Sequence, residues 1–149
     1  MAAKTSTKFP FTLGTIQSLT MLDNGGTFID QAPNAIARLK SLETLNCERL
    51  SKNIWWSLND LVGSNDVLPI RDLNLSDCNI VDEDIRDDIK CLFLLEILDL
   101  SKNSFVRLKQ SLPRLTNLIA LYLNDCFNIQ PQLLPKLPTS LHNVGGQNS

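Results

Sequence analysis

Histidine is nearly missing from this sequence: its 149 residues contain one, His142. A catalytic base needs a positioned partner, and none accompanies His142 in the sequence. The acidic run from Asp82 to Asp88 lacks the glycine and the closing glutamate of a calcium-binding loop. No CxxC pair or metal-ligand spacing occurs among the four cysteines, which are Cys47, Cys78, Cys91 and Cys126. We therefore expect a protein that is not an enzyme, holds no metal or other cofactor and keeps its thiols reduced.

Charge and hydropathy exclude two further kinds of partner. The chain has 14 basic and 16 acidic residues, for a formal net charge of -2, and its basic residues are too scattered to hold a phosphate backbone. No stretch approaches the roughly 18 apolar residues of a membrane span. Residues 1–8 lack the apolar run of a secretory signal. These absences predict a cytoplasmic or nuclear protein that binds neither nucleic acid nor a membrane.

What the sequence does contain is leucine at regular spacing. Residues 67–80, 92–105 and 115–129 follow the pattern LxxLxxLxLxxN, with cysteine at the asparagine position in the first and third copies. Weaker copies begin at Ile16 and Leu39, and a truncated copy begins at Leu141. The first residue of each LxL pair falls at positions 22, 45, 73, 98, 121 and 144, so the period is 23 to 28 residues. This period is typical of leucine-rich repeats.

The repeat predicts an α/β fold, a right-handed leucine-rich-repeat solenoid. A short parallel sheet should line its concave side, and helical turns and loops should form its convex side. Because side chains alternate along a strand, Leu98 and Leu100 should point into the core. Ile97, Asp99 and Ser101 should then face solvent on the concave side.

Two features of the turns follow from the same pattern. The side chain at the asparagine position should satisfy backbone groups that the turn leaves unpaired, with Asn103 donating and accepting, and Cys78 and Cys126 acting weakly. The apolar spacing over residues 81–95 predicts a helix or helical turn on the convex side. Trp55 and Trp56 lie in the longest repeat, where one ring either packs under the convex side or forms an exposed binding protrusion.

The expected domain organisation is simple. Residues 1–8 form a disordered tail, residues 9–146 form one leucine-rich-repeat domain of about five to six repeats, and residues 147–149 form a second tail. Neither end of the domain carries a polar cap in the sequence, and an uncapped solenoid exposes leucines and a strand edge. We therefore expect self-association through the ends.

The repeats resemble the leucine-rich-repeat region of plant intracellular immune receptors of the TIR, nucleotide-binding, leucine-rich-repeat family. Five phrases carry the resemblance: LKSLETLN (39–46), LPIRDLNLSDCNI (68–80), LEILDLSKNSFVRL (95–108), LTNLIALYLNDC (115–126) and LPKLPTSL (134–141). It implies a protein-binding module in the defence response, with a role in effector sensing or autoinhibition. The 149 residues contain no GxxxxGK[ST] phosphate loop and no TIR-like segment, so we expect a fragment or truncated product.

The expected partner is a protein: a pathogen effector, a guarded host protein or the nucleotide-binding domain of the same receptor. Outward positions of the strands form the expected concave contact surface, since burial does not dictate their residue types and aromatic residues often anchor contacts. The candidate contact residues are Asp72, Asn74, Ile97, Asp99, Tyr122 and Asn124. Two alternatives stay open. One is a cytosolic scaffold unrelated to immunity, and the other is a regulatory element that binds the nucleotide-binding domain of its own receptor.

Overall fold

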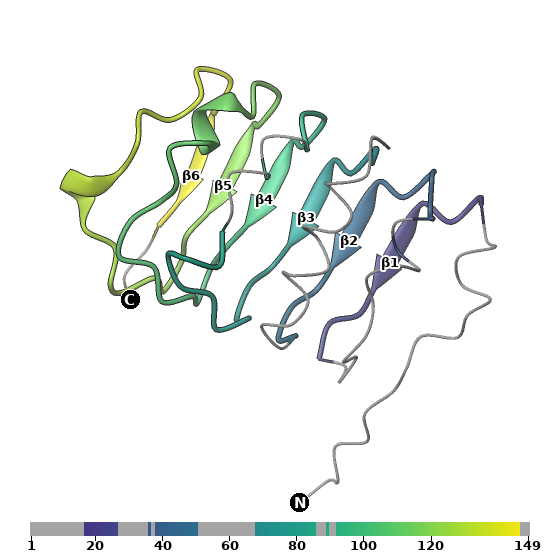
Figure 1. Ribbon diagram of the computed structural model, residues 1–149, viewed down its shortest axis with the longest axis horizontal. Helices are drawn as coiled ribbons and strands as arrows, with labels where there is room; N and C mark the ends of the chain where they lie inside the picture. The colour runs from purple at the N-terminus through teal and green to yellow at the C-terminus, as the bar shows by residue number, and fades with distance from the viewer. Residues whose placement is uncertain are drawn as a thin grey trace, which may run out of the picture.

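The computed structural model describes residues 17–26, 36, 38–50, 68–85, 89 and 92–146. Six short strands lie side by side in chain order and form one parallel sheet (Figure 1). The strands are β1 (Met21–Asp23), β2 (Thr44–Asn46), β3 (Asp72–Asn74), β4 (Ile97–Asp99), β5 (Ala120–Tyr122) and β6 (Asn143–Gly145). Two short 3-10 helices, η3 (Leu112–Arg114) and η4 (Pro131–Leu133), lie in the last two connections. The predicted leucine-rich-repeat solenoid is confirmed.

The strand register follows the repeat spacing. Each strand places its central residue opposite that of its neighbour, so a single row crosses the sheet through Leu22, Leu45, Leu73, Leu98, Leu121 and Val144. These are the six positions at which the spacing predicted strands. Because side chains alternate in and out along each strand, this register also aligns the outward residues in rows.

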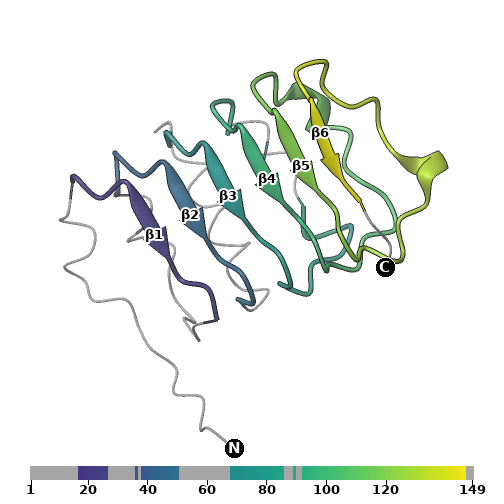
Figure 2. The same ribbon diagram turned by 180° about the vertical axis from the view of Figure 1, so that it is seen from behind.

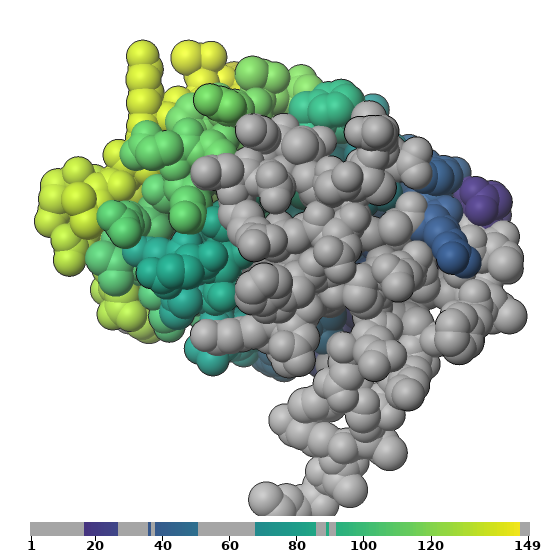
Figure 3. Space-filling view, viewed as in Figure 1, coloured from purple at the N-terminus to yellow at the C-terminus, as the bar shows by residue number. Residues whose placement is uncertain are grey.

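The inward leucines form one continuous core. Leu45, Leu73, Leu98 and Leu121 are each 0% exposed, and they belong to one cluster with the buried residues of the connections. Each such side chain contributes on the order of 1.5 to 3 kcal/mol to folding. In the space-filling view, the connecting segments of the last two repeats close over this side of the sheet (Figure 3). The core therefore lies between the sheet and the returning chain.

Backbone hydrogen bonds join each repeat to the next where the strands begin. The carbonyl of Glu43 accepts two consecutive N–H groups, those of Arg71 at 2.8 Å and Asp72 at 3.0 Å. The carbonyl of Arg71 in turn accepts the N–H groups of Glu96 and Ile97 at 2.8 and 2.9 Å. The same arrangement at every strand entry holds successive strands at a constant offset.

A second series of hydrogen bonds follows the strands. Arg49, Asp77, Lys102 and Asp125 take positive φ angles of 60°, 55°, 58° and 57° at the same place in successive repeats. The N–H groups of Arg49, Asp77 and Lys102 donate to the carbonyl two residues past the next strand, at 3.0, 2.9 and 2.7 Å. Non-glycine residues adopt such angles at a cost. The stacking of identical turns offsets that cost.

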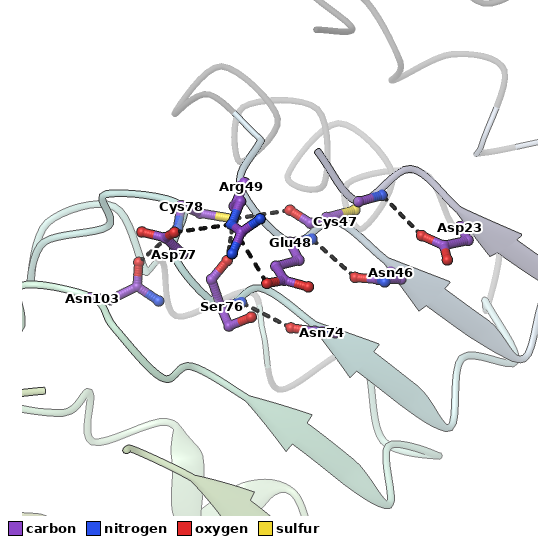
Figure 4. Close-up of polar contacts among 11 residues, drawn as sticks. Asp23, Asn46, Cys47, Glu48, Arg49, Asn74, Ser76, Asp77, Cys78 and Asn103 are labelled. Atoms are coloured by element: carbon purple, nitrogen blue, oxygen red, sulfur yellow. Dashed lines mark hydrogen bonds and ion pairs between the residues drawn. The ribbon is translucent and has the colours of Figure 1, made fainter. Parts of the chain in front are cut away.

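Asn103 satisfies backbone groups in two repeats, as predicted. Its side chain is 3% exposed, and its Oδ1 accepts the N–H groups of Cys78 at 3.1 Å and Ile80 at 3.0 Å. Its Nδ2 donates to the carbonyls of Leu75 at 2.9 Å and Leu100 at 2.8 Å. Figure 4 shows Asn103 beside Cys78 at the edge of this turn. One amide thus joins the turns that follow β3 and β4.

Cysteine takes the place of asparagine in two repeats and makes fewer bonds. The Sγ of Cys78 donates to the carbonyl of Cys47 at 3.0 Å, and the Sγ of Cys126 donates to that of Leu100 at 3.3 Å. A thiol is a weak donor, and it lacks the second polar atom of an amide. The predicted difference between Asn103 and the two cysteines is confirmed.

One prediction about the connections differs from the structure. Ser101 is 4% exposed instead of facing solvent, and its Oγ accepts the N–H of Asn124 at 3.1 Å. The strand ends at Asp99, so the in–out alternation no longer applies at Ser101. For the segment 81–95, the described residues show turns, which agree with the helical turn that the prediction allowed.

The first of these turns is closed by one acidic residue. The carboxylate of Asp84 accepts the N–H of Val81 at 2.9 Å, while its own N–H donates to the carbonyl of Val81 at 3.0 Å. The apolar residues predicted to face the core, Ile85, Ile89, Leu92 and Leu95, are all buried. The expectations for residues 1–16, for Trp55 and Trp56, for Cys91 and for residues 147–149 lie outside the described residues.

Leu98 tests the strand register. Leu98→Ala should lower the free energy of unfolding by about 2 to 5 kcal/mol, because the side chain is fully buried between repeats. The matched variant Asp99→Asn should change it by less than about 0.5 kcal/mol, because asparagine keeps the oxygen that accepts the Ser101 N–H. Urea denaturation followed by circular dichroism measures both. Equal losses would show that the register is wrong.

Asn103 tests the turn network. Asn103→Ala should destabilise the protein by more than about 2 kcal/mol, because it leaves the buried N–H groups of Cys78 and Ile80 without an acceptor. Asn117→Ala is the control, since its exposed amide donates one hydrogen bond, to the Phe93 carbonyl at 2.7 Å. Thermal unfolding of the two variants should differ clearly. Similar midpoints would mean that the Asn103 amide is not required.

Candidate protein-binding surface

One face of the sheet is directed away from the core and corresponds to the predicted concave side. Seen from behind, the strands face the viewer and the connections lie beyond them (Figure 2). Outward side chains form two rows across this face, which we call the open face. The row at the strand starts is Met21, Thr44, Asp72, Ile97, Ala120 and Asn143, and the row at the strand ends is Asp23, Asn46, Asn74, Asp99, Tyr122 and Gly145.

Five of the six candidate contact residues come together on three adjacent strands. Asp72 lies opposite Ile97, Asn74 lies opposite Asp99, and Asp99 lies opposite Tyr122. All five are half-buried, so each keeps part of its side chain in solvent. The sixth, Asn124, is half-buried two residues past β5. The structure therefore places the candidates on one surface, and their role in binding stays a prediction.

Several of these polar side chains also shape the backbone, which sequence reasoning missed. The side-chain oxygens of Asp23, Asn46, Asn74 and Asp99 each accept the N–H two residues later, at 2.9 to 3.0 Å. Figure 4 shows three of these bonds, at Asp23, Asn46 and Asn74. The sequence could have indicated these hydrogen bonds, because the last strand position is aspartate or asparagine in four repeats. Both residue types form this local turn.

Tyr122 breaks that row and lies against Gly145. A Cβ atom added to Gly145 would stand 2.7 Å from Cδ1 of the Tyr122 ring and 3.4 Å from Oδ1 of Asn124. The ring thus occupies the space that a larger residue in β6 would fill. The ring therefore packs on the backbone of Gly145, and the pairing of a glycine with a tyrosine in the repeat register is the feature of the sequence that indicates this contact.

Carboxylates on the open face and beside it differ in whether they form ion pairs. Arg71 forms an ion pair with Glu96, and Arg49 pairs with Asp77 at 3.3 Å and with Glu48 at 3.7 Å. Within the described residues, Asp72 has no such partner. Burial, and then the negative charge of Asp99, raise the pKa of Asp72 above its usual value of 3.8. A charged Asp72 is therefore poorly compensated by the described residues.

The three described cysteines are buried, and the histidine is exposed. Burial is the main cause of a raised pKa at Cys47, Cys78 and Cys126, and it raises the pKa of Cys78 to about 11. All three thiols are therefore protonated near neutral pH. His142 is exposed and contacts the carbonyl of Ser140. The described residues contain no group of three or more potential ligands that could hold a metal ion.

A hollow beside the open face offers a second surface. It lies at the turns that follow β4 and β5 and is lined by Lys102, Asn103, Ser104, Asp125, Phe127 and Asn128. Phe127 is 67% exposed, which is unusual for a large apolar side chain. This surface corresponds to a rim of the solenoid, and it is the alternative that a binding experiment has to separate from the open face.

The repeat, the register and the single parallel sheet define a leucine-rich-repeat protein. The chain is 30% identical to TMV resistance protein N of Nicotiana glutinosa over 135 residues, which are 91% of the chain. The match spans 12% of the length of that protein. The fold is also similar to that of a leucine-rich-repeat protein of Leptospira interrogans, with a TM-score of 0.66 and 20% identity over 95% of this chain and 38% of the other. No family model matches the chain. No helix in the described part is long and apolar enough to cross a membrane.

The buried thiols give a chemical test. In a Cys91→Ser variant, the remaining thiols should react with a thiol reagent at neutral pH at least about a hundredfold more slowly than a free cysteine, because they are buried and protonated. In denaturant all three should react at the rate of a free thiol. Rapid reaction of any one in the folded protein would contradict its placement in the core.

Asp72 gives a test by pH. The raised pKa means that the folded state holds this proton more tightly than the unfolded chain, so ionisation of Asp72 destabilises the fold as pH rises through that pKa. Asp72→Asn should therefore be more stable than wild type at neutral pH, and this gap should narrow as pH falls through the raised pKa and be closed below 3.8. Denaturation across this range, with Glu83→Gln as an exposed control, measures it. A gap that does not vary with pH would exclude this cause.

Proposed function

We propose that this chain is the protein-binding leucine-rich-repeat module of a plant intracellular immune receptor, and that the open face is its contact surface. The observation that carries the proposal is the patch of half-buried polar, apolar and aromatic side chains on β3 to β5, which no described connection crosses (Figure 2). The similarity to TMV resistance protein N supports the immune role. The module acts by binding and performs no catalysis.

The open face is suited to binding because its side chains are already ordered. Asn74 and Asp99 are held by hydrogen bonds to the backbone, and the Tyr122 ring is held against Gly145. A surface that is ordered before binding loses less conformational entropy in the complex. Tyrosine also presents a large contact area with a polar tip, and such residues often dominate binding energy. Tyr122 is therefore the expected anchor.

The resemblance to the immune-receptor family suggests three kinds of partner. These are a pathogen effector, a guarded host protein and the nucleotide-binding domain of the same receptor. All three would be met in the cytoplasm or nucleus. Binding to the nucleotide-binding domain would make the module a regulatory element that holds a receptor inactive. This partner can be tested without knowledge of a pathogen.

The test measures association in plant leaves by split luciferase. The chain is co-expressed with the nucleotide-binding domain of a receptor of this family and with a panel of pathogen effectors. The double variant Tyr122→Ala/Asp99→Ala should weaken association with the true partner by about tenfold or more. Phe127→Ala should leave it unchanged, and circular dichroism should show that both variants are folded.

The outcomes separate the two surfaces. Loss of association in Phe127→Ala with retention in the double variant would move the binding site to the hollow beside the open face. Association with neither the nucleotide-binding domain nor any effector would count against these two partners and leave a guarded host protein. Association with the nucleotide-binding domain alone would support the regulatory role.

A further inference from the structure

Charge is distributed unevenly over the open face. Acidic side chains lie on β1, β3 and β4, whereas β4 and β5 carry an aliphatic and an aromatic one. The acidic residues are Asp23, Asp72 and Asp99, and the other two are Ile97 and Tyr122; Glu43 and Ile119 directly precede β2 and β5. Ile119 is 42% exposed although it is aliphatic. The two groups meet on β3, β4 and β5.

At that meeting point, four residues form a compact patch, which we call the Asp72–Tyr122 patch. It consists of Asp72, Ile97, Asp99 and Tyr122. Asp72 lies opposite Ile97, and Asp99, two residues further along the same strand, lies opposite Tyr122. Two carboxylates therefore alternate with an aliphatic side chain and an aromatic ring over three neighbouring strands.

The two carboxylates of the patch have no cationic partner within the described chain. Arg71 is paired with Glu96, and Arg49 is paired with Asp77 and Glu48. Neither Asp72 nor Asp99 forms an ion pair with a described residue. The half-burial of both carboxylates reduces their contact with water. A cation from outside would relieve the repulsion between them.

The remaining members of the patch favour a particular kind of cation. Arginine and lysine combine an apolar stem with a charged head, so the stem packs on apolar surface while the head reaches a carboxylate. Ile97 offers the apolar surface, and the Tyr122 ring offers a face on which a guanidinium group can stack. An arginine can also donate two hydrogen bonds to one carboxylate. A small inorganic cation would make no use of Ile97 or Tyr122.

We propose that the Asp72–Tyr122 patch binds an arginine or lysine side chain of a protein partner, so that the partner's contact segment is basic. This inference rests on the proposed function, because it assumes that the open face binds protein. The inference adds to that function the chemical class of the side chain that the patch binds. A cation placed here also lowers the pKa of Asp72, reversing the effect of burial and of Asp99.

The test uses a phage-displayed library of random linear peptides, selected on the purified chain. Selected peptides should be enriched in arginine and lysine, and their affinity should fall as salt concentration rises. Asp72→Asn/Asp99→Asn should raise their Kd by about tenfold or more. The control Asp77→Asn/Glu83→Gln removes the same charge at exposed positions off the patch and should raise Kd less than about twofold.

The patch variant is chosen so that it folds. Asparagine occupies the position of Asp99 in two other repeats, as Asn46 and Asn74, and forms the same backbone hydrogen bond there. At Asp72 the neutral amide removes a charge that burial disfavours. Urea denaturation of the variant should confirm unchanged or higher stability, so a loss of peptide affinity reports on the charges.

The outcomes also separate this proposal from the proposed function. Neutral or acidic peptides whose binding is lost in Tyr122→Ala would overturn the basic occupant and keep the open face as the binding surface. Peptides that are insensitive to both the patch variant and Tyr122→Ala would overturn both. Failure to select any peptide that binds the folded chain would count against both as well.

Discussion

The stacking of each repeat on the next is the constraint on which the whole structure depends. A strand of three residues with one inward leucine has no stability of its own, and it forms because the adjacent repeats bury that leucine on both sides. Two series of backbone hydrogen bonds keep successive repeats in the same register, one where the strands begin and one in the turns that follow them. Asn103 reinforces the turn between β3 and β4 from within the core.

This constraint also determines what the open face presents. Because every strand pairs at the same offset, outward residues form rows, and residues far apart in sequence become neighbours. Asp72 lies on β3 and Tyr122 lies on β5, so only β4 separates their strands although they are distant in sequence. A substitution at an outward position therefore alters the surface of the open face without altering the core. Such an arrangement is suited to the recognition of proteins.

The sequence predicted the positions of the strands well because the leucine spacing reports the core directly. It located all six strand centres, from Leu22 to Val144, and the role of Asn103. It was wrong for Ser101, where the strand had already ended, and for residues 81–95 it left a helix and a helical turn open. Periodicity reports which residues are buried, and it does not distinguish a helix from a series of turns that buries the same apolar residues.

The candidate contact residues were identified by position, whereas their local contacts were not. Alternation along the strands placed Asp99 and Tyr122 on the outer face, and the structure agrees. The hydrogen bond from Asp99 to its own turn and the contact of Tyr122 with Gly145 depend on three-dimensional detail that one repeat alone does not reveal. That Asp72 has no ion-pair partner among the described residues likewise appears only in the three-dimensional arrangement.

The most direct measurement of the central claim is a methyl nuclear Overhauser experiment on leucine-labelled protein. We expect cross-peaks between the methyl groups of Leu45 and Leu73, of Leu73 and Leu98, and of Leu98 and Leu121, because these side chains lie in one inward row. Leu45 and Leu121, three strands apart, should share none. Absence of the three neighbour cross-peaks in folded protein would contradict the stacked register, and with it the surface proposed for binding.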